Sequence, residues 1–290
     1  MAASDGNYYL AFEYANEGSV DEYLKSNNHN ASVNQPLVPD ECIKSIIRGA
    51  MQGLAHIHNH GIIHRDIKPA NLLLSNGICK IADFTLSRRV VSAAAAIGDA
   101  TRLTTYVSTR WYRAPELLLK APFYGTPVDV YAMGCLTAEM YDPFGNPLFA
   151  TASEVGQLHQ IFSSLGVPTQ ESWPEGVRLM RELKIECPRM EDRMQLELRL
   201  APYLTSTSLD WIRNMLALRP EHRMSAEQSL QHPFLSSNQP GVEVVPVISS
   251  TSSALSEMSS PTGRSTTTAP IQKPRVVRNP YQKKQLSAVQ

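Results

Sequence analysis

The hydrophobic pattern of the chain is mainly helical. Between Glu41 and Asn59 the apolar residues recur at steps of three and four. They are Ile43, Ile46, Ile47, Ala50, Met51, Leu54 and Ala55. This spacing predicts a helix with one apolar face, and Gly61 stands where that helix would end. The mostly apolar run 129–140 predicts a second helix that is buried on all sides.

Shorter segments complete the pattern. Further helices are expected at 20–25, 153–165, 206–217 and 226–231. Prolines 202, 220 and 233 lie between or after them, as helix breakers should. Short apolar runs predict strands at 8–12, 62–63, 72–74 and 78–82, and the first of these is expected to be buried.

Three segments lack a pattern of this kind. Residues 26–35 are rich in Asn and predict a loop, and residues 87–103 predict a mobile surface segment. The composition changes near Leu235, because residues 236–270 are rich in Ser, Thr and Pro and contain no aromatic side chain. Such a segment buries too little apolar surface to offset its ordering entropy, so 236–290 is expected to be a disordered tail.

Charge separates the tail from the body of the chain. The 290 residues hold 27 Lys or Arg and 27 Asp or Glu, and this balance argues against a protein that binds polyanions along its whole length. The tail carries six basic and two acidic side chains. Its basic groups, at Lys273–Arg275 and Lys283–Lys284, are candidates for a nuclear-localisation signal or a patch for an acidic partner. The alternative is an ordinary solvated terminus.

The remaining composition bounds the location of the protein. Four cysteines lie far apart without a CxxC pair, which argues against a disulfide scaffold or a zinc finger and fits a reducing compartment. No apolar run is long enough to span a membrane, and residues 1–7 do not have the pattern of a signal peptide. We therefore expect a cytoplasmic or nuclear protein without a membrane or nucleic-acid partner.

One stretch of polar residues is far more specific than the rest. Residues 64–74 have the sequence HRDIKPANLLL, followed by Asp83-Phe84-Thr85 and, 29 residues after Thr85, by Ala114-Pro115-Glu116. The alternative, that these are ordinary loop and turn residues, does not predict their order and spacing. The set resembles the catalytic loop, the magnesium-binding motif and the APE motif of protein kinases.

The resemblance implies a role for each residue. Phosphoryl transfer needs positioning and charge neutralisation more than covalent chemistry. Asp66 would orient or accept the proton of a substrate hydroxyl, and Lys68 would reach the phosphate of ATP that is transferred. Asn71 and Asp83 would offer oxygen ligands to Mg²⁺. A Lys at position 68 resembles the serine/threonine rather than the tyrosine kinases.

A second block narrows the family to the CMGC group. Residues 104–116, TTYVSTRWYRAPE, resemble the activation segment of the MAK-like (RCK) kinases and then of the mitogen-activated kinases. The later runs 148–155, 166–168 and 173–176 are similar to a helix and an insert of the same group.

In this family, Thr104 and Tyr106 would be phosphorylated by an upstream kinase. Each phosphate adds roughly −1.5 to −2 charge and needs guanidinium partners. The resemblance implies that Arg110 and Arg113 would bind the phosphate of phosphotyrosine. It implies that Arg65 and Arg88 would bind the phosphate of phosphothreonine. The alternatives are a buried aromatic side chain at Tyr106 and an ordinary surface charge at Arg110.

Four further matches are architectural. Asp129 resembles an aspartate that hydrogen-bonds the backbone of the catalytic loop. Glu116 and Arg223 resemble an ion pair that is buried in the large lobe. Thr109 resembles a residue that braces Asp66 and Lys68. For each of the four, the alternative is an ordinary surface or capping residue.

The N-terminal segment resembles the end of the small lobe and the hinge. Phe12 would be the gatekeeper, the backbone groups of Glu13 and Ala15 would hydrogen-bond adenine, and Leu73, with Lys68 near the phosphates, would complete the ATP site. The sequence contains no G-x-G loop and no VAIK motif, which this family places in the small lobe. Thr85 replaces the glycine of the DFG motif, and a β-branched residue lacks the backbone freedom of glycine there.

The resemblance implies an α+β, kinase-like fold in which the α-helical large lobe predominates. Residues 1–15 would be a remnant of the small lobe and the hinge, 16–235 the large lobe, and 236–290 the tail. Within the large lobe, 64–71 would be the catalytic loop, 83–116 the activation segment and 167–205 the CMGC insert. The implied activity is transfer of the ATP γ-phosphate to Ser or Thr of proteins, with Mg²⁺ and a preference for a following proline. The alternative is a pseudokinase, consisting of the large lobe, that serves as a binding scaffold.

Overall fold

The computed structural model describes residues 9–28, 35–89, 110–186, 196, 200 and 202–236. Its helices are α1 (Val20–Asn27), α2 (Asp40–Asn59), α3 (Pro115–Leu118), α4 (Pro127–Tyr141), α5 (Glu154–Leu165), α6 (Pro174–Glu182), α8 (Ser206–Met215), α9 (Ala226–Gln231) and α10 (Pro233–Ser236). Its strands are β1 (Ile62–Ile63), β2 (Leu72–Ser75), β3 (Ile78–Ile81) and β4 (Arg88–Arg89). The helices expected from the pattern are confirmed to within two residues. Helices α3, α6 and α10 were not predicted.

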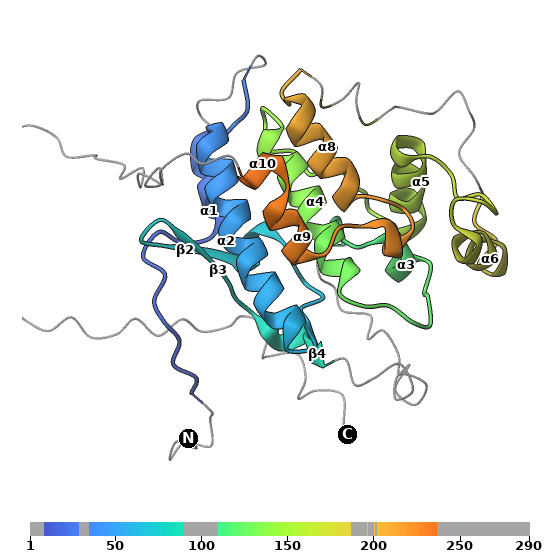
Figure 1. Cartoon of the computed structure of the whole chain (residues 1–290), viewed down its shortest axis with the longest axis horizontal. Helices are drawn as coiled ribbons and strands as arrows, with labels where there is room; N and C mark the ends of the chain where they lie inside the picture. The colour runs from blue at the N-terminus through green and yellow to red at the C-terminus, as the bar shows by residue number, and fades with distance from the viewer. Residues whose placement is uncertain are drawn as a thin grey trace, which may run out of the picture. The chain divides into compact units, whose positions relative to one another are not determined.

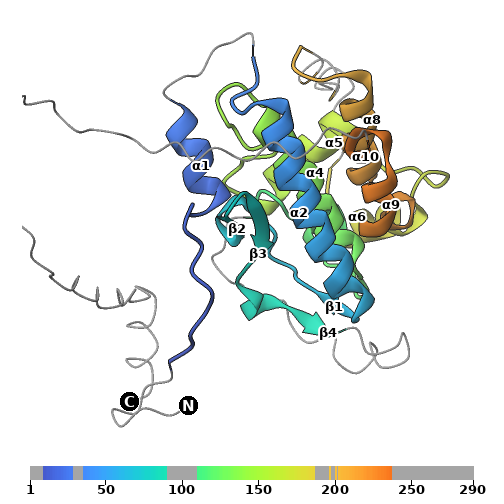
Figure 2. The ribbon, with the colours of Figure 1, turned by 60° about the vertical axis from the view of Figure 1, so that its left-hand side comes forward.

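Helix α2 forms one wall of the core. Its buried residues are the seven apolar residues that the pattern placed on one face. That face packs against β3 and α9, so the helix lies along the β2–β3 hairpin (Figure 2). The hairpin is antiparallel, with Leu72 opposite Ile81 and Ser75 opposite Ile78. Asn76 and Gly77 connect the strands with φ values of 52° and 73°, the left-handed pair that a two-residue hairpin turn requires.

Helix α4 runs through the middle of the large helical body (Figure 1). Every residue from Val128 to Tyr141 is buried, as the apolar run predicted. The helix packs against α2 on one side and α8 on another. Two acidic residues on it, Asp129 near its start and Glu139 near its end, are among these buried residues and face the loops described below.

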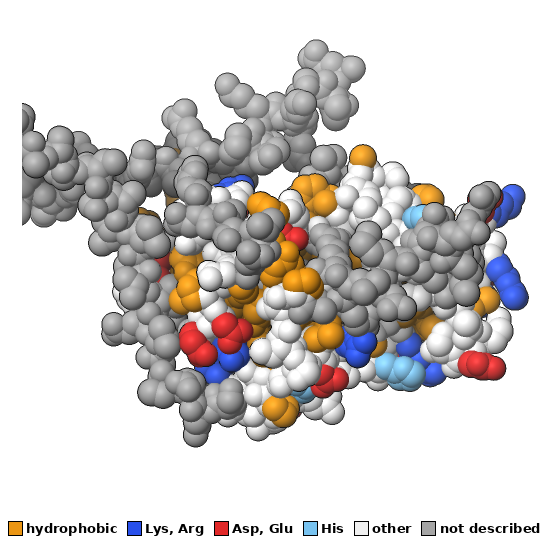
Figure 3. Space-filling model, turned by 90° about the horizontal axis from the view of Figure 1, so that it is seen from above, with side chains coloured by type: hydrophobic (Ala, Val, Ile, Leu, Met, Phe, Trp, Pro, Cys, Tyr) orange, Lys and Arg blue, Asp and Glu red, His pale blue; other side chains and the backbone are white. Residues whose placement is uncertain are grey.

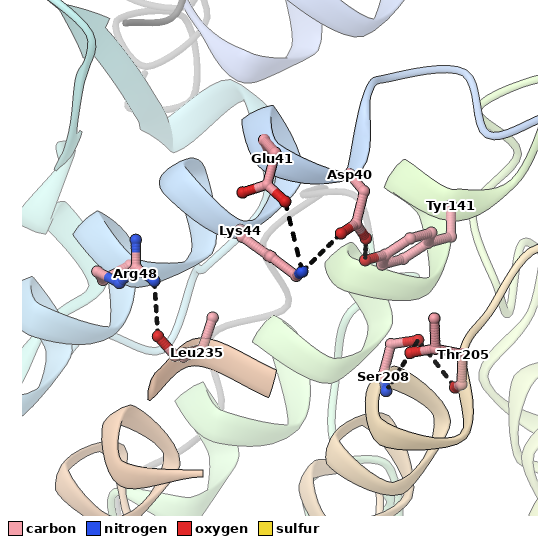
Figure 4. Close-up of polar contacts among 8 residues, drawn as sticks. All are labelled: Asp40, Glu41, Lys44, Arg48, Tyr141, Thr205, Ser208 and Leu235. Carbon is pink, nitrogen blue, oxygen red and sulfur yellow. Dashed lines mark hydrogen bonds and ion pairs between the residues drawn. The ribbon is translucent and has the colours of Figure 1, made fainter. Parts of the chain in front are cut away.

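Side chains of α2 and α4 hold the end of the described chain in place (Figure 4). Arg48 Nη2 donates a hydrogen bond of 2.6 Å to the carbonyl of Leu235. Lys44 Nζ lies 2.6 Å from Asp40 Oδ2 and 5.9 Å from the centre of the Phe234 ring. The Tyr141 hydroxyl bonds to Asp40. These contacts join α10 to the body immediately before residue 237.

The strand predicted at 8–12 is wrong for the part of it that is described. Residues 9–12 have no regular secondary structure, and the exposed fractions of Leu10 and Phe12 are 79% and 84%. A strand needs a neighbour that pairs with its backbone groups. The described strands pair only β1 with β4 and β2 with β3, so this segment has no such neighbour among them.

The described surface mixes charges of both signs. On the face shown in Figure 3, Lys and Arg side chains are scattered among Asp and Glu side chains and hydrophobic ones. Within the described ranges, no helix combines the length and apolar character needed to cross a bilayer. Residues 90–109 and the tail from 237 onward lie outside the described residues, and with them the predictions of a mobile segment up to 103 and of a disordered tail.

Candidate functional site

Three predicted residues meet on the loop between β1 and β2. Lys68 Nζ lies 2.6 Å from Asp66 Oδ2, and the Asn71 amide donates to the same oxygen at 3.0 Å and to the Asp66 carbonyl at 2.8 Å. Asn71 belongs to a 3₁₀ turn, η2 (Pro69–Asn71), in which Pro69 fixes the first backbone angle. Asp66 and Lys68 remain partly exposed, whereas Asn71 is buried. A carboxylate is thus presented to solvent with two donors aimed at it.

The backbone of this loop is strained and is held from α4. Arg65 has φ 72°, a left-handed value that is uncommon for a residue with a side chain. The Asp129 carboxylate accepts from the backbone N–H of His64 at 2.8 Å and of Arg65 at 2.7 Å. His58 Nε2 lies 2.9 Å from the same carboxylate. Asp129 therefore has the contacts that the sequence assigned to it, and His58 adds one that was not predicted.

His64 links the loop to the segment after β3. Its ring is fully buried, and Nδ1 lies 3.3 Å from the Asp66 backbone N–H, which donates to it. Nδ1 must therefore be unprotonated, so Nε2 carries the proton and donates to the Ala82 carbonyl at 3.0 Å. The ring also meets Phe84 edge-on, with 5.0 Å between ring centroids. His64 was not among the predicted site residues.

Asn71 and Asp83 are brought to one end of the hairpin. Asn71 directly precedes β2 and Asp83 closely follows β3, and the Ala82 N–H donates to the Asn71 carbonyl at 2.9 Å. Asp83 has φ 62°, and its Oδ1 accepts from the Thr85 N–H at 3.3 Å. Thr85 lies inside the 3₁₀ turn η3 (Phe84–Leu86), a conformation that a β-branched residue adopts without needing the freedom of glycine.

This donor set fits Mg²⁺. Magnesium prefers hard oxygen ligands and is usually held by one or two protein side chains together with phosphate oxygens and water. Asp83 offers a carboxylate on an exposed residue and Asn71 an amide oxygen. Among the described residues, no cluster of three His, Cys, Asp or Glu side chains is placed to hold a metal by itself. A cation here would therefore depend on ligands from a bound phosphate.

Two predicted arginines share one carboxylate. Arg110 Nη1 lies 3.8 Å and Arg113 Nη1 3.7 Å from Glu154 Oε1, at the first turn of α5. Burial lowers the pKa of Arg113, and Glu154 opposes that shift. The buried Gln157 amide donates to the Arg110 carbonyl at 2.7 Å, and Trp111 Nε1 to the Thr151 carbonyl at 3.2 Å. Glu154 and Gln157 were not predicted as site residues, because their partners lie more than forty residues away in the chain.

The other regulatory residues are only partly described. Arg88 lies in β4 and pairs with Ile63, two residues before Arg65. The two arginines assigned to phosphothreonine thus come from β4 and from the loop that follows its partner strand β1. The Arg65 guanidinium lies 5.7 Å from the Tyr124 ring centre. Thr104, Tyr106 and Thr109 lie outside the described residues, so their assigned roles stay predictions.

The pair Glu116–Arg223 is present and buried. The exposed fractions of the Glu116 and Arg223 side chains are 3% and 0%. Arg223 donates to Glu116 Oε1 at 2.6 Å and to Oε2 at 2.8 Å, and its guanidinium also stacks 4.8 Å from the Tyr131 ring centre. The pair joins α3 to the segment that precedes α9.

The predicted adenine site is not assembled by the described residues. Phe12 is exposed, which contradicts a gatekeeper packed inside a pocket, because no described element covers it. The Glu13 side chain reaches Lys80 at 2.5 Å, and Ala15 accepts a long bond from the Gly18 N–H at 3.5 Å. Leu73 is half-buried in β2 and pairs with Ser19, so it is the chain just after the segment assigned to the hinge that lies against the strand assigned to the floor.

Comparisons with known proteins agree with this geometry. Residues 1–235 match the protein kinase domain family. The chain is 42% identical over 200 residues to Cyclin-dependent kinase F-3 of Oryza sativa, a match that covers 69% of the chain and 44% of that protein. It is 38% identical over 228 residues to human Serine/threonine-protein kinase MAK, a match that covers 78% of the chain and 33% of that protein. It is 40% identical over 193 residues to Serine/threonine-protein kinase ppk23 of Schizosaccharomyces pombe, a match that covers 66% of the chain and 46% of that protein. The chain thus spans less than half the length of these relatives.

Proposed function

Because the chain belongs to the protein kinase family, in its CMGC group, we propose that the protein transfers the γ-phosphate of ATP to serine or threonine hydroxyls of protein substrates. The observation that carries this proposal is the cluster of Asp66, Lys68 and Asn71 around one carboxylate oxygen. The names of the relatives, which are kinases, favour an enzyme over a binding scaffold.

The roles proposed for the loop residues follow from their contacts. Asp66 is oriented by Asn71 and Lys68, so its free acceptor capacity can take up the proton of a substrate hydroxyl. The Lys68 ammonium lies beside it, where it would bond a phosphate oxygen as negative charge develops during transfer. His64 and Asp129 hold the backbone that sets both positions.

Magnesium would be held by Asn71 and Asp83 together with phosphate oxygens. When bound, the cation neutralises phosphate charge, which is a main requirement of phosphoryl transfer. For the protein, the consequence is that the Asp83 carboxylate must be accessible. Its exposure and its position at the end of β3 are consistent with this.

We extend the proposal to regulation and substrate choice. Phosphorylation of Thr104 and Tyr106 by an upstream kinase would bring anionic groups to Arg65 and Arg88 and to Arg110 and Arg113. The pairing of both Arg110 and Arg113 with Glu154 supports a site in which two guanidinium groups meet one anion. A proline after the phosphorylated residue, and a cytoplasmic or nuclear location, rest on the resemblance and on the composition.

The test is a kinetic comparison on protein expressed from the complete transcript. Asp66→Asn keeps the size of the side chain and removes the base, so kcat should fall by roughly 10²–10⁴-fold. The matched control is Asp210→Asn, which changes an exposed aspartate of α8 that contacts His232, and it should stay within about twofold of the wild type. Equal activity of the Asp66→Asn variant and the wild type would refute the proposal.

A further inference from the structure

Three histidines occupy alternate positions at the end of α2, and they face in two directions. His58 is largely buried, and its Nε2 lies 2.9 Å from the Asp129 carboxylate. His56 and His60 are four residues apart, so they share one face of the last helical turn, and both are exposed. Their ring centroids lie 4.4 Å apart, with an angle of 39° between the ring planes. This exposed pair has no part in the site around Asp66.

The hydrogen bond of His60 fixes which of its ring nitrogens is free. Its Nδ1 lies 2.7 Å from the carbonyl oxygen of His56, an atom that can only accept. Nδ1 must therefore carry a proton and donate it, so Nε2 keeps its lone pair in the neutral ring. Histidines that bind metals are commonly oriented in this way, because the second ring N–H is donated to a carbonyl or a carboxylate. His60 thus has the tautomer and the support of a metal ligand.

His56 supplies a second nitrogen beside it. Within the described ranges, the ring nitrogens of His56 have no hydrogen-bond partner, and the ring contacts that of His60. The terminal side-chain torsion of histidine has broad energy wells, so the exposed ring can turn a nitrogen toward His60 Nε2 at little cost. Two histidines four residues apart on a helix are a known zinc-binding arrangement, because the helical repeat places both rings on one face.

The surroundings of the pair favour a cation. The pair lies at the C-terminal end of α2, where the last carbonyls carry partial negative charge. Asn59, between the two histidines, donates to the Glu227 carboxylate of α9 at 2.6 Å, so an acidic side chain is held at the same turn. Imidazole ligands suit Zn²⁺ or Cu²⁺, whereas Mg²⁺ and Ca²⁺ prefer oxygen. The described residues offer no group of three His, Cys, Asp or Glu ligands, so water would complete the coordination shell.

We propose that His56 and His60 together bind a divalent transition-metal ion, Zn²⁺ or Cu²⁺, through one ring nitrogen each. The ion clamps the last turn of α2 to the residue that caps it. His58 of the same turn contacts Asp129, which holds the backbone of the catalytic loop, so the ion also steadies the base of that loop. The unfolded chain does not hold the two rings together, so binding stabilises the folded protein.

The test is a titration of the full chain, without a histidine tag, with Zn²⁺ alone in competition with a chromophoric chelator. Loss of a partner that merely supports a metal ligand weakens binding on the order of 10–100-fold, so His56→Gln, which removes a ligand, should weaken Zn²⁺ binding by about tenfold or more. The matched control is His159→Gln, at an exposed histidine of α5 that has Val155 and Ser163 four residues away. It should leave the Zn²⁺ affinity unchanged.

Stability against urea gives a second measurement that does not depend on kinase activity. Zn²⁺ should raise the unfolding midpoint of the wild type and of His159→Gln relative to those of His56→Gln and His60→Gln, and EDTA should remove the difference. Both histidines are exposed, so neither substitution removes core packing. A Zn²⁺ affinity that is equal in the wild type and in His56→Gln would overturn the inference, as would an equal loss of affinity in His159→Gln.

Discussion

Replacing Glu116 by glutamine would leave the Arg223 guanidinium in the core without a counter-ion. The side chains are 3% and 0% exposed, so water cannot substitute for the lost carboxylate. Breaking a buried pair in this way costs about 3–5 kcal/mol of the free energy of unfolding. Three backbone carbonyls, of Ala217, Pro127 and Leu218, still accept from Arg223 at 2.8, 3.0 and 3.2 Å, which places the expected cost near the lower bound.

The assay is urea unfolding followed by tryptophan fluorescence, since Trp211 and Trp173 are buried and will report loss of the core. Arg223→Met should cost a similar amount, because it leaves a buried carboxylate instead. The double variant Glu116→Gln/Arg223→Met should be more stable than the sum of the two single losses predicts, because no charge is then left unpaired. Single losses below about 1 kcal/mol would refute the view that this pair is buried and essential.

Three further predictions follow from other contacts. Gly176→Ala should destabilise the protein, because a Cβ at Gly176 would lie 2.3 Å from the buried Trp173 ring; a lower urea midpoint checks this. The pKa of Glu139 is about 7 in the folded protein, against an ordinary 4.5, so the folded state binds more protons than the unfolded state between these pH values. As the pH rises from 4.5 to 7, the free energy of unfolding of the wild type should therefore fall by about 3 kcal/mol relative to that of Glu139→Gln. Urea midpoints at pH 5 and 7.5 measure the difference, and equal midpoints would contradict it. Asp83→Asn should weaken Mg²⁺-dependent ATP binding about tenfold or more by calorimetry, whereas unchanged affinity would count against the proposed ligands.

Much of the helical fold was predictable because it depends on local periodicity. The seven apolar residues of α2 and the continuous run in α4 are the residues that the structure buries. Helix α6 was not predicted, although Leu179 and Met180 are buried in it. The strand at 8–12 was predicted, but the described part of that range is not a strand. Its local pattern is apolar, but pairing is a property of neighbours that a local pattern does not contain.

The candidate site was predicted as residue types and not as a network. Asp66, Lys68 and Asn71 are close in sequence, and their motif indicated their proximity. The contacts that hold their loop come from far away: Asp129 is more than sixty residues from His64 and Arg65. Gln157, which bonds the Arg110 carbonyl, lies 47 residues from it. The signal for His64 was present in the HRD motif itself, whereas nothing local marks the bond between Glu139 and Tyr112.

The most direct measurement of the central claim is the fate of the γ-phosphate of ATP. Protein from the complete transcript is incubated with Mg²⁺, γ-labelled ATP and a protein substrate, and the labelled residues are identified after hydrolysis. Label on phosphoserine or phosphothreonine that disappears in Asp66→Asn is the predicted result. Label that is absent from the substrate, or that persists at an equal level in Asp66→Asn, would contradict the account.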